Sequence, residues 1–151
     1  MPALSKGGGG VMDPVMSTAL SGLTASVARL NVSASNTADS ETRGPVPSTP
    51  PSQPLPPSSG GPAVYQAIQL TQTAASGGGV SIGYAPVKPS YVQTYDPTAP
   101  FADGGGMVAA PNVDPVAEQV EQITARASFM ANLAVLKTAD EMNRSLFDVR
   151  T

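Results

Sequence analysis

Apolar residues recur at helical spacing in two long segments of the chain, residues 13–38 and 114–148. An Asp-Pro pair opens each segment, which is typical of a helix start because Asp caps the first turn and Pro fits its first position. Steps of three and four residues between apolar positions predict one apolar stripe along each helix. The first stripe is Met16, Leu20, Leu23, Val27, Leu30 and Ala34; the second begins Val116, Val120, Ile123, Ala127 and Met130 and drifts to Ala131, Val135, Ala139, Met142 and Leu146.

Between the two helical segments the pattern changes twice. Eight of the sixteen prolines lie within residues 40–62, interleaved with Ser and Gly. This composition predicts a polyproline-type linker or a disordered loop, and it argues against a domain. Apolar and polar residues alternate in short runs over residues 63–110, with glycine-rich turns between them. These runs predict a small antiparallel β element of three or four strands.

The expected fold class is therefore mainly α with a small β element. The N- and C-terminal helices are expected to form a coiled-coil-like hairpin, with the Pro- and Gly-rich loop and the short strands between them. The predicted segments are a flexible leader (1–12), an N-terminal helix (13–39), a Pro-rich linker (40–62), the β element (63–110) and a C-terminal helix (111–151).

The amino-acid composition excludes most kinds of enzyme active site. The 151 residues include no Cys and no His, which excludes disulfides, Cys or His nucleophiles and the usual zinc ligands. The glycine runs match no phosphate-binding loop. Glu118 and Glu121 lie one turn apart on a predicted helix, a spacing typical of a solvated face rather than of two catalytic carboxylates in a cleft. We therefore predict no enzymatic activity, no catalytic residue, no cofactor and no metal site.

The charge pattern narrows the class of partner. The eight basic residues are scattered and the net charge is −3, which argues against a nucleic-acid partner. No run approaches the roughly 20 apolar residues of a membrane span, so direct membrane insertion is not expected. No secretory signal pattern is present, which by itself fits a cytoplasmic protein or export without a cleaved signal. Within one chain, the two apolar stripes have little other apolar surface to pack against. We therefore expect these stripes to bind protein partners.

Two blocks of sequence resemble bacterial flagellar rod and hook proteins. The first contains Arg-Leu-Asn-Val-Ser-Ala-Ser-Asn and ends at Asn36; the second includes Tyr95-Asp-Pro and Pro-Asn-Val-Asp-Pro-Val and leads into the C-terminal helix. Together they cover residues 15–40 and 90–148. The second block is most similar to the proximal rod proteins. The chain thus resembles the flagellar basal-body rod protein family.

This resemblance implies a structural subunit that polymerises helically, with its terminal helices in an inner coiled-coil tube, and that serves motility. It also implies a place in the periplasmic rod of the flagellar basal body. Export would use the flagellar type III apparatus without a cleaved signal peptide, and the partners would be other rod proteins and copies of itself. The alternative that the residues leave open is a soluble helical binding module or assembly scaffold that uses the Pro-rich loop.

The two stripes supply the expected interface. We predict that their large apolar side chains pack against each other within and between subunits, and that two asparagines at motif positions satisfy hydrogen bonds there. The expected interface residues are Leu20, Leu23, Val27, Leu30, Asn36, Val116, Val120, Ile123, Met130, Asn132, Leu136, Met142 and Leu146.

Overall fold

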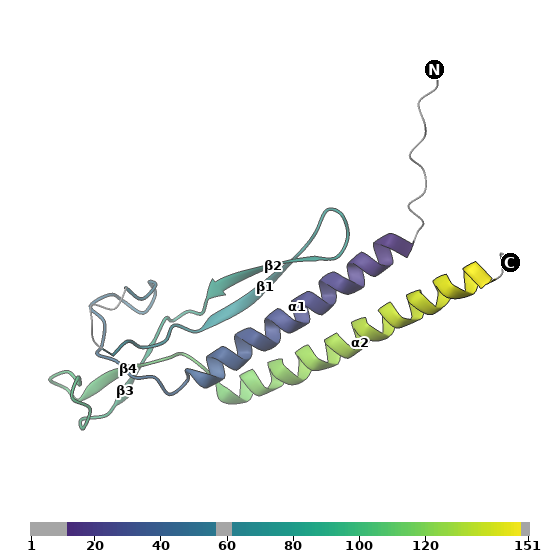
Figure 1. The fold of residues 1–151 in the computed structure, drawn as a ribbon. Helices are drawn as coiled ribbons and strands as arrows, with labels where there is room; N and C mark the ends of the chain where they lie inside the picture. Colours follow the sequence, from purple (N-terminus) through teal and green to yellow (C-terminus); the bar gives the residue numbers. More distant parts are fainter. Residues whose placement is uncertain (1–11, 57–61, 149–151) are drawn as a thin grey trace, which may run out of the picture.

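Two long helices dominate the computed structural model, which describes residues 12–56 and 62–148. Helix α1 spans Met12–Ala38 and helix α2 spans Pro115–Asp148. They lie side by side and run in opposite directions (Figure 1). At 1.5 Å per residue, α1 is about 40 Å long and α2 about 51 Å. The prediction of a mainly helical fold with a small β component is confirmed.

The start of α2 follows the predicted capping pattern. The Asp114 carboxylate accepts hydrogen bonds from the backbone N–H groups of Val116, at 2.9 Å, and Ala117, at 3.3 Å. Pro115 is the first helical residue, where its missing N–H costs no hydrogen bond. Helix α1 begins at Met12, one residue before Asp13. The first Asp-Pro pair therefore lies inside the first turn instead of in front of it.

Within the described residues, four short antiparallel strands are present, as predicted, and they form two separate two-stranded sheets. The hairpin β1–β2 lies along α1 on the side opposite α2, whereas β3–β4 lies beyond the C-terminal end of α1 (Figure 1). The β1–β2 hairpin packs on α1, and the β3–β4 pair lies away from it. The two pairs do not join into one sheet. The strands are β1, Ile68–Ala74; β2, Val80–Pro86; β3, Val92–Tyr95; and β4, Met107–Ala110.

The tip of the β1–β2 hairpin rests directly on α1. Gly78 and Gly79 have φ angles of +89° and +84°, which glycine adopts without steric cost. A Cβ atom added to Gly79 would overlap the Ser21 hydroxyl of α1. The same hydroxyl accepts a 3.1 Å hydrogen bond from the backbone N–H of Val80. Conformation and close approach both require glycine here, and together they hold the hairpin on the helix.

Small side chains make up most of the buried interior. Alanines account for the majority of the buried apolar residues, whereas most large apolar side chains of the helices are exposed. The helices can therefore approach closely, because interaxial distance depends on the side chains at the contact. The buried apolar residues of the described chain are Ala19, Leu23, Ala25, Ala28, Val32, Ala67, Tyr91, Val108, Ala109, Ala110, Ala125 and Ala139.

The Pro-rich segment is tied to the fold over its described residues, 40–56 and 62. The Pro51 carbonyl accepts 2.8 Å and 3.0 Å hydrogen bonds from the backbone N–H and hydroxyl of Ser90, and the Thr49 carbonyl accepts one of 3.0 Å from the Tyr91 hydroxyl. Gly44 forms a bridge with Ala109 of β4. The described part of this predicted linker is therefore held by hydrogen bonds, because a proline-rich chain keeps carbonyl acceptors that buried donors can use. The predicted leader, apart from residue 12, lies outside the described residues.

Candidate assembly interface

The contact between α1 and α2 is built from small and polar residues at steps of three, four and seven. On α1 these are Ala19, Gly22, Ser26, Ser33 and Asn36, and all but Gly22 are buried. A Cβ atom added to Gly22 would lie 2.7 Å from the Asn132 side-chain oxygen on α2. The Ser33 hydroxyl donates a 2.9 Å hydrogen bond to the backbone carbonyl of Glu118. A side chain of one helix thus contacts the backbone of the other. Such a close approach requires small residues at the contact.

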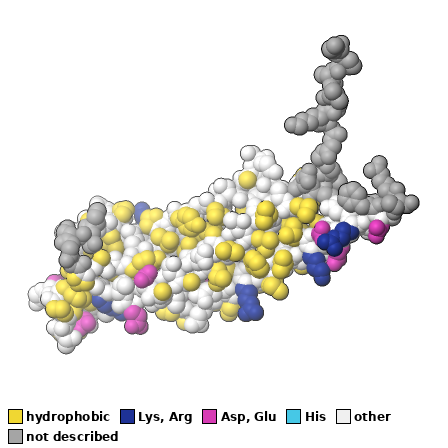
Figure 2. Space-filling model, in the orientation of Figure 1, with side chains coloured by type: hydrophobic (Ala, Val, Ile, Leu, Met, Phe, Trp, Pro, Cys, Tyr) yellow, Lys and Arg dark blue, Asp and Glu magenta, His cyan; other side chains and the backbone are white. Residues whose placement is uncertain are grey.

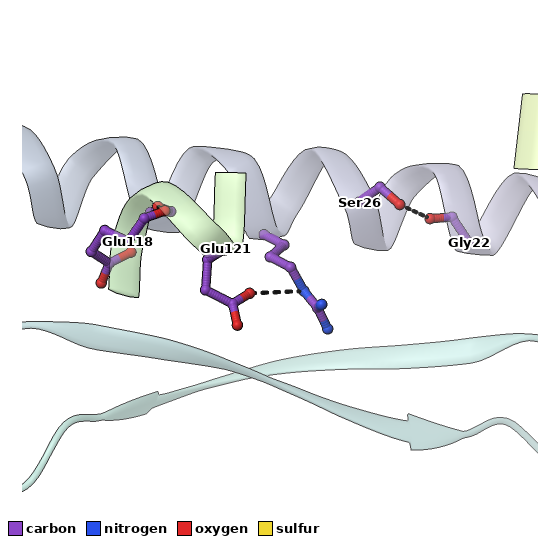
Figure 3. A network of polar contacts seen from close by, with 6 residues as sticks. Gly22, Ser26, Glu118 and Glu121 are labelled. Carbon is purple, nitrogen blue, oxygen red and sulfur yellow. Dashed lines mark hydrogen bonds and ion pairs between the residues drawn. The ribbon is translucent and has the colours of Figure 1, made fainter. Parts of the chain in front are cut away.

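Figure 3 shows two features beside this contact. The Ser26 hydroxyl bonds at 2.8 Å to the Gly22 carbonyl within α1, so this buried polar group is satisfied without a partner from α2. Glu118 and Glu121 project from the first turns of α2, and Glu121 forms an ion pair of 3.6 Å with Arg29 of α1. Arg29 is the only charged residue of α1 after Pro14. This charge, which is only partly exposed, is therefore already paired within the chain.

The large apolar stripes lie mostly outside the helix contact, which corrects the prediction that they pack together within the chain. Leu23 is the exception, at 8% exposure. The small-residue contact brings the helices close and turns the larger stripes toward solvent. The exposed members are Leu20 (59%), Val27 (44%), Leu30 (41%), Val116 (69%), Val120 (57%), Ile123 (68%), Met130 (59%) and Met142 (51%).

Three of these predicted residues nevertheless share one surface. Val27 and Leu30 of α1 and Ile123 of α2 line a groove of about 580 Å³ between the helices, together with Phe129. Phe129 lies outside the two apolar stripes predicted from the sequence. Leu136 is partly exposed, and the side chain of Leu146 lies outside the described residues. Packing of the exposed stripes between subunits stays a prediction.

Hydrophobic side chains gather along the middle of the molecule over the helix pair, and charged side chains lie mainly toward its ends (Figure 2). At the far end of α2, Lys137 pairs with Glu141 at 3.8 Å and Arg144 with Asp140 at 2.8 Å. The exposed Met142 of the apolar stripe lies among these charged pairs.

Asn36 joins three elements through its side-chain amide, which is 2% exposed. Its Nδ2 donates to the Ile68 carbonyl at 2.8 Å and to Glu118 Oε1 at 2.7 Å. Its Oδ1 accepts from the Tyr65 hydroxyl at 3.0 Å and from the Ile68 N–H at 3.2 Å. The amide thereby uses both donors and both acceptor sites. We call these residues, Asn36, Tyr65, Ile68 and Glu118, the Asn36 hub; it ties the end of α1 to the starts of β1 and α2.

The two predicted asparagines thus differ in their surroundings. Asn36 makes its hydrogen bonds within one chain. Asn132 is partly exposed and donates a 2.9 Å hydrogen bond to the Ser128 carbonyl one turn earlier in α2. A role for either residue between subunits stays a prediction.

The Asn36 hub predicts a loss of stability at alkaline pH. Burial, followed by the negative charges of Asp39 and Glu118, raises the pKa of the Tyr65 hydroxyl above 10.0. The unfolded chain releases this proton first, so the contribution of Tyr65 is complete below about pH 10 and is lost as pH rises through the higher folded-state pKa. Urea unfolding between neutral pH and pH values above 10 should show a steeper loss for the wild type than for Tyr65→Phe. Parallel curves for the two proteins would contradict this.

The described residues carry no candidate for metal or membrane chemistry. Across residues 12–56 and 62–148, no three His, Cys, Asp or Glu side chains are grouped to hold a metal ion. Within the same ranges, neither helix combines the length and apolar character needed to cross a bilayer. What remains as a site is the outer surface of the helix pair.

Comparison with known proteins identifies the family. Residues 105–149 match the family described as flagellar basal body rod FlgEFG protein C-terminal. The flagellar basal-body rod protein FlgC of Escherichia coli is 36% identical over 132 residues, which cover 81% of this chain and 85% of that protein. FlgC of Salmonella typhimurium is likewise 36% identical over 132 residues, with the same coverage of 81% and 85%.

A shorter and more similar match comes from FlgC of Buchnera aphidicola. It is 44% identical over 66 residues, which span 43% of this chain and about half, 48%, of that protein. The longer matches cover 81% of this chain, so the likeness is not confined to one end. The chain therefore belongs to the FlgC family of flagellar basal-body rod proteins, and it is a structural subunit of the rod rather than an enzyme.

Proposed function

We propose that this rod subunit polymerises helically through α1 and α2, in contact with copies of itself and with other rod proteins. The observation that carries the proposal is the exposure of the large apolar stripes, while small residues fill the contact inside the chain. Burial of apolar surface is favourable by about 25 cal/mol per Å². Coiled-coil-like packing of the outer stripes between subunits would bury this apolar surface, which stays exposed in the isolated chain.

Location in the flagellar basal body follows from the family. We further propose the periplasmic rod as the site of assembly, and export through the flagellar type III apparatus without a cleaved signal peptide. The support is the resemblance of both terminal blocks to rod proteins, together with a core made mainly of alanine. Such a core buries little apolar surface per residue, so the chain can pass through an export channel unfolded at modest energetic cost.

A scaffold that works through the Pro-rich loop is not favoured. The Thr49 and Pro51 carbonyls already accept hydrogen bonds from Tyr91 and Ser90. A groove that binds polyproline needs a solvated proline helix free to dock. The described part of this segment is instead attached to the β3–β4 end of the molecule.

Ile123→Asp is expected to abolish rod assembly without unfolding the subunit. Ile123 is 68% exposed, so a carboxylate there stays hydrated in the monomer and becomes buried only in the assembled rod, at a cost of several kcal/mol per subunit. The measurement is swimming of a strain that lacks its own FlgC and carries the variant, with helix content of the purified protein checked by circular dichroism.

The matched control is Val92→Asp, on β3 and 38% exposed, which introduces the same charge away from the helices and should swim normally. Equal swimming of the two variants would remove the α2 stripe from the interface. Leu23→Asp would be less informative, because Leu23 is buried within the chain and its substitution damages the fold itself.

A further inference from the structure

A second apolar groove lies between α1 and the β1–β2 hairpin. Its volume is about 410 Å³, and none of its lining side chains is charged. Ile82 and Tyr84 of β2 form one wall, and Tyr84 is 60% exposed. Leu23 and Val27 lie on the α1 wall. We call this surface, whose lining residues are Leu23, Thr24, Val27, Ala28, Asn31, Ile82 and Tyr84, the hairpin groove.

Helix α2 presents an exposed apolar ridge. Val116, Val120, Ile123 and Met130 fall at steps of four, three and seven residues, which places them on one side of the helix. Their exposure is 57–69%. The ridge is about 21 Å long. Like the hairpin groove, it contains no charged side chain. We call these four residues the α2 ridge.

We infer that the α2 ridge of one copy packs into the hairpin groove of a second copy, and that Ile82 and Tyr84 are interface residues of the rod subunit. This inference rests on the proposed function, since it names the contact through which copies assemble. A groove without charged walls takes an uncharged apolar helix face, and burying such a face removes no charge from water. The chain itself carries a face of that chemistry, which selects a second copy as the occupant.

The positions of the two surfaces explain why such a contact would propagate. The hairpin lies on one side of α1 and α2 on the other (Figure 1). The hairpin groove is lined by residues of α1 and β2, and the α2 ridge belongs to α2, so the two surfaces share no residue. When different surfaces of identical subunits meet, the contact is heterologous, and each added copy leaves a free groove or a free ridge for the next. An open-ended array follows, whereas contact of ridge with ridge would close a dimer.

Cysteine cross-linking between separately purified variants tests this contact. The chain contains no Cys, so each introduced thiol is unique. Full-length V120C and Y84C, carrying affinity tags of different size, are mixed and treated with a mild oxidant. We expect a disulfide-linked heterodimer several-fold more abundant than either homodimer. The control mixture is V120C with V92C, because Val92 is an exposed apolar residue outside both surfaces; it should give only background cross-linking.

Sedimentation of the wild-type protein over a concentration series separates this inference from the proposed function. If the wild type self-associates and V120C pairs mainly with itself, the contact is ridge to ridge, which overturns the inference and leaves self-assembly intact. If the wild type self-associates and V120C with Y84C gives no more product than the control mixture, the hairpin groove is not the acceptor. If the wild type does not self-associate at any concentration, self-assembly and this contact both fail.

Discussion

Asn36→Asp is expected to lower the free energy of unfolding by about 3–5 kcal/mol. The asparagine amide donates to Glu118 Oε1 at 2.7 Å and to the Ile68 carbonyl at 2.8 Å. An ionised aspartate has no proton to donate, and it would place a negative charge beside the Glu118 carboxylate at a position that is 2% exposed. Urea unfolding of the wild type and the variant at neutral pH measures the loss.

Two further variants make this result specific to the Asn36 hub. Asn31→Asp adds the same charge on the exposed side of α1 and should change stability by less than about 0.5 kcal/mol. Adding Glu118→Gln to Asn36→Asp removes the like charge and supplies an amide donor, so the double variant should regain a large part of the lost stability. If Asn36→Asp and Asn31→Asp unfold at the same urea concentration, the hub does not hold the three elements together.

Gly22→Leu is expected to lower the free energy of unfolding by about 1–3 kcal/mol through overpacking of the helix contact. The first added carbon alone would lie 2.7 Å from the Asn132 oxygen and 2.8 Å from its Cγ and Nδ2. The gain in helix propensity on replacing glycine, about 1 kcal/mol, offsets only part of this. The expected result is a helix pair that is held apart or shifted in register, measured as a lower urea midpoint.

The control for Gly22→Leu is Ala34→Leu, which adds a large side chain to the exposed side of the same helix and should leave stability nearly unchanged. Shortening the opposing side chain by Asn132→Ala should rescue Gly22→Leu more than it affects the wild type. The coupling energy of this double-mutant cycle is the diagnostic quantity. A coupling of zero would mean that Gly22 and Asn132 do not form the close contact between the helices.

The local features of this chain were predictable because they depend on neighbouring residues. The Asp114-Pro115 pair places the start of α2 where the structure has it, since capping involves only the first turn. Steps of three and four residues predict both helices, and turn residues separate the short strands. The two family-like blocks, which are also local, indicated a flagellar rod protein before any contact was known.

Only the tertiary structure decided which side of each helix faces inward. Both helices carry two stripes at similar spacing, one of large apolar residues such as Leu20 and Ile123 and one of small residues such as Gly22 and Ala125. Residue spacing is similar in the two stripes, so periodicity does not distinguish them. Hydrophobicity alone favours burial of the stripe of large apolar residues. The structure buries the small stripe instead, because two helix backbones in close contact leave room only for glycine, alanine and serine between them.

Tertiary packing also decides the hydrogen bonds of the Asn36 hub and those that attach the Pro-rich segment to the fold. Asn36 meets Tyr65, Ile68 and Glu118, and the Pro51 carbonyl meets Ser90; these partners are separated by about thirty to eighty positions along the chain. A residue's identity states how many hydrogen bonds it can make, but the packing of distant elements determines with which groups it makes them. The sequence thus determined the elements and the family, and the tertiary structure determined which surfaces are left for assembly.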